Sequence, residues 1–199
     1  MLGKSKMMFL FGLVLISFIF ISNPAPSMAA EKAVALKAVS AFPQNNRMND
    51  AFWMLQKKVK EKSKGMLEIT WGGGPEAIPT FQLVEAIRNG VVDMAWTAHT
   101  FNVSQVPVVE GAKLSKMSPW DEKKRGVYDF YQKAYQSKLN AYYLGRGTPG
   151  LTYNLYTTVP VKAIGEFKGL TIRVTPAYKA FVEALGATPV TTDHGEVFN

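Results

Sequence analysis

The sequence contains no cysteine and only two histidines among its 199 residues. The absence of cysteine excludes disulfide bonds, thiolate metal sites, iron–sulfur clusters and a cysteine nucleophile. Neither His99 nor His194 has a second histidine or a carboxylate at the spacing of a metal-binding motif. No serine lies in the Gly-x-Ser-x-Gly motif of many hydrolases. The sequence therefore predicts neither a metal site nor a cofactor, and it favours a protein that is not an enzyme.

Acidic residues are also scarce. There are 15 Asp and Glu against 23 Lys and Arg, which gives a formal net charge of +8. Such an excess would suit a nucleic acid partner. The composition, 47% hydrophobic and 19% charged, is that of a folded chain long enough to bury a core. Composition thus indicates one large domain or two small lobes and leaves the partner open.

The first thirty residues have the pattern of an export signal. Lys4 and Lys6 precede an apolar run at 7–21, and small residues at 27–30 follow it. A transmembrane anchor is the alternative, but this run has about fifteen residues and a membrane-spanning helix needs about 20. We therefore predict a cleavable signal peptide over residues 1–29 and a periplasmic location. Removal of Lys4 and Lys6 lowers the net charge from +8 to +6, and export argues against a nucleic acid partner.

The rest of the chain alternates between strand and helix patterns. Apolar runs predict strands at 33–41, 67–71 and 91–96, with helices between them from Asn49 to Gly65 and from about Pro79 to Gly90. This spacing is typical of βαβ units with a parallel sheet, and so of an α/β fold. The lysines of the first helix are predicted to form a solvated basic face.

The second half of the chain continues the alternation. Ser118 and Pro119 predict the start of one helix that runs through an apolar stripe at Val127, Phe130, Tyr131 and Ala134. Strands are predicted at 140–144, 151–156 and 170–174, a helical turn at 164–167 and a helix from Thr175. The stretch 145–150 is rich in glycine and is the best candidate for a crossing between two lobes.

Two features could contact a ligand. Gly72-Gly73-Gly74 follows a strand and precedes a helix, so it either presents backbone N–H groups to an anion or forms a flexible turn. Arg173 lies near the carboxyl end of an apolar strand, where a guanidinium needs a neutralising partner. Its planar fork matches a carboxylate, but a structural ion pair or an edge position in solvent remains open.

Several segments resemble a known family when taken together. Gly90-Val91-Val92-Asp93-Met94 and Lys168-Gly169-Leu170-Thr171-Ile172-Arg173-Val174 are the specific ones, with supporting segments at 59–69 and 185–190. In this order and spacing they are similar to the solute-binding proteins of tripartite ATP-independent periplasmic (TRAP) transporters, DctP type. The resemblance spans residues 33–199 and implies a two-lobed periplasmic-binding-protein fold. It implies a receptor that closes on a small organic acid and delivers it to integral-membrane permease subunits.

The resemblance also implies ligand-binding residues. The family's carboxylate-binding arginine falls on Arg173. Tyr153 stands where some members have a second arginine, which suggests a monocarboxylate with an apolar or aromatic body. Other residues fall near ligand-facing positions: Phe42, Thr80, Trp96 and Ala98, with His99 adjacent.

Family members continue past residue 199, so we expect a first lobe over 30–148 and an incomplete, C-terminally truncated second lobe over 149–199. The remaining alternatives are a secreted carbohydrate-active hydrolase and a periplasmic adaptor that binds protein.

Overall fold

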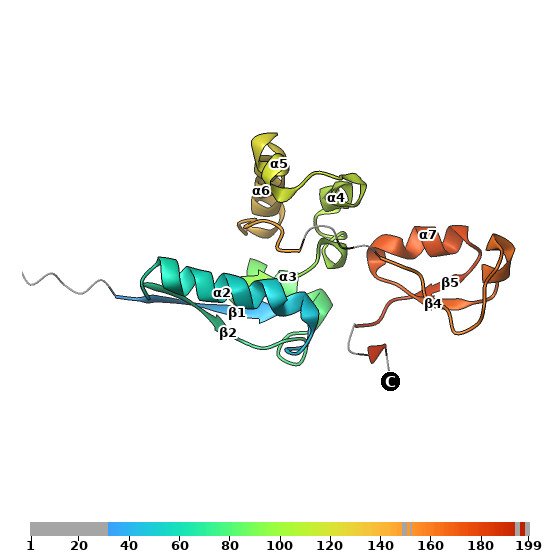
Figure 1. Ribbon diagram of the computed structural model, residues 1–199, viewed down its shortest axis with the longest axis horizontal. Coiled ribbons are helices and arrows are strands. Elements are labelled where there is room, and N and C mark those ends of the chain that lie inside the picture. The colour runs from blue at the N-terminus through green and yellow to red at the C-terminus, as the bar shows by residue number, and fades with distance from the viewer. Residues whose placement is uncertain (1–31, 149–150, 152, 194–195, 198–199) are drawn as a thin grey trace, which may run out of the picture. The chain divides into compact units, whose positions relative to one another are not determined.

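The chain folds around two small parallel sheets, which are blue to green and orange to red in Figure 1. The computed structural model describes residues 32–148, 151, 153–193 and 196–197. The predicted signal peptide lies outside these residues. Within them, no helix is long and apolar enough to cross a membrane.

The first sheet has three parallel strands: β1 (Val34–Ser40), β2 (Leu67–Trp71) and β3 (Met94–Trp96). β1 is central, in the order β2-β1-β3. Helix α2 (Asp50–Lys62) connects β1 to β2, and α3 (Leu83–Arg88) connects β2 to β3. The predicted βαβ rhythm is therefore confirmed, with β2 at its expected bounds and β3 shorter than expected.

Apolar side chains of α2 hold this helix on the sheet. Phe52 is fully buried and forms a cluster with Ala38, Ile69 and Met94 of the three strands. Leu55 and Val59 pack against the same cluster, one and two helical turns beyond Phe52. The opposite face of α2 carries exposed lysines, as the sequence predicts.

A helical layer follows the first sheet. It contains α4 (Gly111–Leu114), α5 (Pro119–Lys124) and α6 (Val127–Leu139). The Ser118 hydroxyl accepts a hydrogen bond from the Asp121 amide at 3.2 Å, so the predicted N-cap is confirmed. The prediction of one helix from there is wrong, because Gly126 has a φ of 78° and separates α5 from α6.

The buried face of α6 differs from the predicted stripe. Tyr131, Tyr135 and Leu139 recur every four residues and are buried, whereas Phe130 is 56% exposed. Together with Tyr143 they pack against Val84 of α3, which joins the helical layer to the first sheet.

The second sheet has two parallel strands, β4 (Thr171–Arg173) and β5 (Thr188–Val190), joined by α7 (Lys179–Ala184). Ile172 and Val174 face a small core that also contains Val182, which is fully buried. Gly186 has a φ of 81° where the chain turns from α7 into β5. Six short 3-10 helices complete the fold: η1 (Arg47–Asn49), η2 (Thr80–Gln82), η3 (His99–Phe101), η4 (Pro107–Glu110), η5 (Ile164–Phe167) and η6 (Pro176–Tyr178), counted within the described residues.

Two predicted strands are not formed. Asn140 adopts a left-handed conformation that ends α6, and the amide of Tyr143 donates to the side-chain oxygen of Gln132 at 2.8 Å. This side chain takes the place of a neighbouring strand at 140–144. The predicted strand at 151–156 lies partly outside the described residues, and residues 153–156 form no strand. β-Propensity alone does not make a strand without a partner to pair with.

Candidate functional site

Five of the predicted site residues lie at one edge of the first sheet. Phe42 follows the carboxyl end of β1, and Thr80 follows β2 after a loop. Trp96 ends β3, and Ala98 and His99 come directly after it. Because the three strands are parallel, their carboxyl ends share this edge, where α/β proteins commonly bind ligands. Phe42, Trp96 and Ala98 also belong to one apolar cluster.

Buried hydrogen bonds fix the loops of this edge. The Ser40 hydroxyl donates to the Asn49 side-chain oxygen at 2.7 Å and accepts from the Phe42 amide at 3.0 Å. The Thr80 hydroxyl donates to the carbonyl of Ala41 at 3.1 Å. Phe42 and Thr80 are 5% and 0% exposed, so their side chains form the packed base of the edge.

Trp96 is held from two directions. Its indole Nε1 donates to the carbonyl of Met48 at 2.8 Å. Gly147, in the predicted crossing, lies so close to the ring that a Cβ at this position would overlap it. The absence of a side chain at 147 therefore allows the backbone at this position to approach the ring of Trp96.

His99 packs among tyrosines of the helical layer. Its ring centroid is 5.9 Å from that of Tyr131, 6.3 Å from that of Tyr135 and 5.7 Å from that of Tyr143. Burial, and to a smaller extent the positive charge of Arg146, lowers the pKa of His99 from 6.5 to about 4. The imidazole is therefore neutral at neutral pH.

A buried ion pair ties the crossing to the helical layer. Arg146 contacts Glu122 through Nε at 3.1 Å and through a terminal nitrogen at 2.7 Å, and it also donates to the carbonyl of Met117 at 2.9 Å. The Glu122 side chain is 4% exposed and that of Arg146 is 19% exposed. This pair fixes the start of the crossing beside His99.

Two backbone amides of the glycine-rich loop donate hydrogen bonds to other groups of the protein. The Gly72 amide donates to the carbonyl of Ala38 at 2.6 Å, and the Gly74 amide donates to a carboxylate oxygen of Glu76, also at 2.6 Å. Both groups thus have protein partners, which favours the interpretation of this loop as a turn.

Arg173 lies on the second sheet and faces away from its core. Ile172 and Val174 are buried, and alternation along the strand places Arg173 on the opposite side. Its Nε and one terminal nitrogen donate to the carbonyl of Thr192, at 3.2 and 2.7 Å. Burial lowers its pKa, with a smaller opposing effect of Asp193. No carboxylate forms an ion pair with Arg173 within the described residues.

Arg173 also lines a cavity of about 330 Å³. The walls are β4 and the segment 154–159, which includes Thr157 and Thr158. Tyr153 lies just before this segment, is 65% exposed, and has its ring centroid 6.0 Å from that of Tyr178. The cavity thus combines one arginine with apolar and hydroxyl-bearing side chains.

A direct hydrogen bond connects the two sheets' loops. The hydroxyls of Thr100, in η3, and Thr175, which precedes η6, pair with each other. Thr100 follows His99, and Thr175 lies two residues after Arg173. The structure therefore places the His99 loop beside the end of β4.

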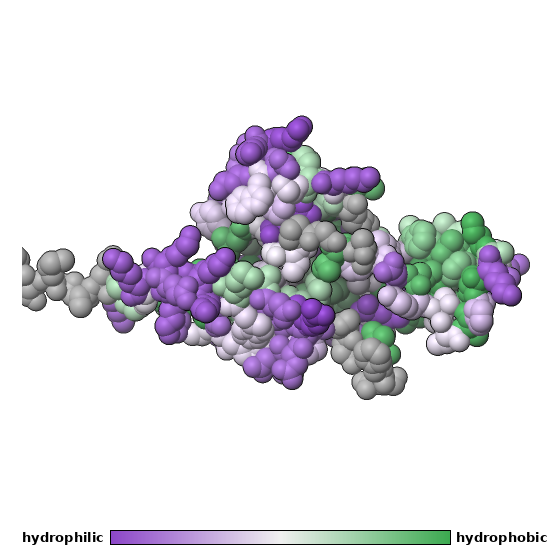
Figure 2. Space-filling view, in the orientation of Figure 1, coloured by the Kyte–Doolittle hydropathy of each residue, from purple (hydrophilic) through white to green (hydrophobic). Residues whose placement is uncertain are grey.

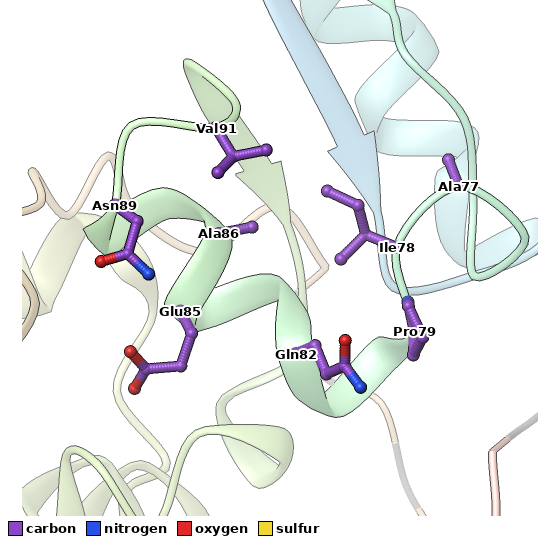
Figure 3. Close-up of a pocket in the computed structure, with 8 residues that line it drawn as sticks. All are labelled: Ala77, Ile78, Pro79, Gln82, Glu85, Ala86, Asn89 and Val91. Carbon is purple, nitrogen blue, oxygen red and sulfur yellow. The ribbon is translucent and has the colours of Figure 1, made fainter.

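A larger cavity lies elsewhere. It measures about 480 Å³ and lies between the loop at 77–79 and α3, where Gln82, Glu85 and Asn89 line it (Figure 3). None of the seven predicted site residues contributes to its walls. Size alone therefore does not identify the site predicted from the sequence.

Three structural features of the site were not predicted: the tyrosines around His99, the Arg146–Glu122 pair and the Thr100–Thr175 contact. All are tertiary contacts, and the partners of the last two are 24 and 75 residues apart. The only local signal was Arg146 itself, a charged residue inside a glycine-rich stretch.

A family model decides the classification. The model for bacterial extracellular solute-binding protein family 7, DctP, matches residues 38–199. The chain belongs to the DctP family. Members of this family bind solutes outside the cytoplasm and are not enzymes, so the resemblance stated from the sequence motifs is confirmed.

Solved DctP-type structures share the fold. A TRAP solute-binding protein from Bordetella bronchiseptica with calcium and picolinate matches with a TM-score of 0.70 at 18% identity, over 84% of this chain and 52% of that one. One from Pseudoalteromonas atlantica with sodium and pyruvate gives 0.65 at 16%, over 84% and 53%. One from Citrobacter koseri with D-glucuronate gives 0.60 at 22%, over 83% and 57%.

These comparisons confirm the α/β fold of periplasmic binding proteins. The chain spans about half the length of the DctP-type structures that it matches. At such identities the similarity establishes the fold and not the ligand. The seven residues predicted to bind the ligand remain predictions.

Proposed function

We propose that this chain is an extracytoplasmic receptor that captures a small organic carboxylate and delivers it to TRAP-type permease subunits. We assign residues 1–29 to a cleavable signal peptide, 30–148 to a first lobe and the chain from 149 to a second lobe. Membership of the DctP family supports this proposal. Pyruvate, D-glucuronate and picolinate, which are bound by the relatives described above, are all small organic acids.

Arg173 carries the proposal. It is a half-buried cation that lines a cavity. Within the described residues its hydrogen bonds go to one backbone carbonyl, which leaves a terminal nitrogen to bind an anion. A carboxylate would gain a charge-assisted hydrogen bond there, and a guanidinium presents a fork that fits two carboxylate oxygens. Exchange of the Thr192 carbonyl for a carboxylate would replace a neutral acceptor by a charged one.

Tyr153 suggests the chemical character of the part of the ligand that does not carry the carboxylate. This tyrosine supplies one hydroxyl and an aromatic face, and Tyr178 lies beside it. A second carboxylate would find no second arginine at this position. We therefore propose a monocarboxylate with an apolar or aromatic body. Phe42, Thr80, Trp96 and Ala98 would shape the facing wall, and neutral His99 would offer a polar contact.

Binding without turnover tests this function. We expect monocarboxylates such as pyruvate or picolinate to raise the thermal stability of the chain and to remain chemically unchanged. A ligand at 100 times its dissociation constant adds about 2.7 kcal/mol to the free energy of unfolding. Turnover of a substrate, lost on replacement of one carboxylate, would instead favour the hydrolase alternative.

Replacement of the arginine tests the site. Arg173→Ala should weaken carboxylate binding by about 2–5 kcal/mol, because it removes one partner of a desolvated charge pair. Calorimetric titration measures this change. Arg88→Ala is the matched control, since Arg88 is about half exposed and, within the described part of the chain, forms its ion pair with Glu85 on its own helix. Equal affinities of both variants and the unmodified chain would contradict the assignment of Arg173.

A further inference from the structure

The edge of the first sheet opposite the predicted ligand site is strongly basic. Because the strands are parallel, β1 and β2 begin at this edge, and α2 ends there. The Val34 amide donates to the carbonyl of Met66 at 2.8 Å, which joins the start of β1 to the turn before β2. The basic edge comprises five exposed lysines: Lys57, Lys58, Lys60, Lys62 and Lys64.

Carboxylates at the basic edge are too few to neutralise it. Glu61 contacts Lys57 at 4.0 Å, and Glu68 contacts Lys60 at 2.7 Å. Five lysines against these two glutamates leave a charge of +3, which is half of the +6 that remains after removal of the predicted signal peptide. Within the described residues, Lys58, Lys62 and Lys64 form no ion pair. Figure 2 shows the hydrophilic side chains gathered over this end of α2.

The fold alone does not account for all of these lysines. Cations in the last turn of a helix are stabilised by its dipole, which covers Lys60 and Lys62. Lys64 lies outside the helix. Lys64 has a φ of 53°, in the left-handed region that glycine or asparagine adopts more easily. The stability of the turn therefore gives no reason for a lysine at 64.

Apolar side chains lie among the lysines. Val34 is 53% exposed and Met66 is 36% exposed, and their backbones are hydrogen-bonded to each other. A surface that combines several lysines with exposed apolar side chains suits a lipid interface, where the lysines meet headgroups and the apolar groups enter the boundary of the acyl chains.

We propose that the basic edge binds the anionic phospholipid headgroups of a membrane surface. The lysines are flexible point charges, which suits a fluid layer of anionic headgroups better than an acidic protein of fixed shape. In the sequence, β1, which begins at this edge, follows the predicted export segment within a few residues, so this edge emerges early during export. The predicted ligand site lies at the opposite edge of the sheet and stays accessible.

Such binding is weak and reversible. Each lysine near an anionic surface contributes roughly a fivefold gain in partitioning, and the contribution falls as salt screens the charges. While bound to headgroups, the protein would have a higher concentration near any partner in the membrane. This effect needs no specific contact with that partner.

Vesicle sedimentation tests the proposal on the chain isolated after export. We expect binding to vesicles of phosphatidylcholine with roughly one-third phosphatidylglycerol, little binding to pure phosphatidylcholine, and loss of binding as salt rises. The combined variant Lys58→Gln, Lys62→Gln, Lys64→Asn should reduce binding on the order of 100-fold.

A control variant removes the same charge elsewhere. Lys124→Gln, Lys133→Gln and Lys138→Gln replace three exposed lysines of α5 and α6, and this variant should bind almost as well as the unmodified chain. Circular dichroism and thermal unfolding establish that both variants are folded. Equal loss in the two variants, equal binding to neutral vesicles, or binding only to acidic proteins would overturn the proposal.

Discussion

The carboxyl edges of the two sheets differ in how their predicted ligand-binding residues are held. In the first sheet, Phe42 and Thr80 are buried, and Trp96 and His99 have partners on several sides. In the second, Arg173 faces a cavity and bonds to one carbonyl. The first edge is thus tightly packed, whereas Arg173 on the second is able to exchange its partner. In the proposed site, the buried residues would shape the wall and Arg173 would contact the ligand.

The variant with the largest expected effect breaks the buried Arg146–Glu122 ion pair. This pair belongs to the first region, by which we mean the first sheet and the helical layer packed against it. Glu122→Ala should lower the free energy of unfolding by about 3–5 kcal/mol, because Arg146 would stay buried without its carboxylate. Urea denaturation measures the loss, and hydrogen exchange locates it. We expect the loss of protection in α5, α6 and the His99 loop, with much less in β4 and β5.

The control for Glu122→Ala is a variant that breaks a solvent-exposed ion pair. Glu68→Ala removes the partner of Lys60, where the two side chains are 46% and 61% exposed, and should cost at most about 1 kcal/mol. Replacement of both buried partners, as Glu122→Leu with Arg146→Met, should recover most of the stability. If Glu122→Ala costs no more than Glu68→Ala, the first region is not held in the way described.

A decrease in pH should have an effect of intermediate size on stability, through His99. The pKa of His99 in the folded chain lies near 4, below its ordinary 6.5. Neutral His99 therefore contributes its full stability above pH 6.5, and this contribution falls as the pH drops from 6.5 to 4, by about 3 kcal/mol. Thermal unfolding across this range measures the loss, to which Arg173 does not contribute because it stays charged there.

Two substitutions assign this pH dependence. His99→Phe keeps an aromatic ring among the tyrosines and should flatten the profile between pH 6.5 and 4. His194→Gln replaces the only other histidine of the sequence and should leave the profile unchanged. The reverse pattern would assign the titration to His194.

The smallest expected effect is at the junction of the two regions. Gly147→Ala would place a Cβ against the ring of Trp96 and should destabilise the chain by about 1–3 kcal/mol. Gly165→Ala is its control, because a Cβ there meets open space and the backbone is not left-handed. Denaturation of both variants compares them directly, and equal stabilities would mean that the crossing is free to move away from the indole.

The local sequence pattern was sufficient to predict an element where the side chains of that segment determine its structure. The alternation Leu67–Trp71 between two glycine turns gave β2 at its observed bounds, and Ser118 gave the start of α5. It was insufficient where distant partners decide. The helical pattern continues on both sides of Gly126 and so does not reveal the break there. The strand β5 was not predicted because it contains Pro189, which an edge strand tolerates and a central strand does not.

The site shows the same limit. Strand ends predicted that Trp96 and Arg173 lie at carboxyl edges, because this depends only on where each strand stops. Sequence did not distinguish buried Thr80 from exposed Tyr153, since burial depends on which segments return to cover them. It also gave no sign that Glu122 is buried, because its partner Arg146 is 24 residues away.

The close approach of Gly147 to Trp96 has an optical consequence. An indole whose N–H is hydrogen-bonded to Met48 and whose ring is covered by the crossing has a defined local environment. Any displacement of the crossing would admit water to that ring and shift its fluorescence emission to the red. Of the four tryptophans, Trp53 and Trp71 lie on α2 and β2 and Trp120 is 75% exposed on α5, so Trp96 is the natural intrinsic reporter of movement at the junction.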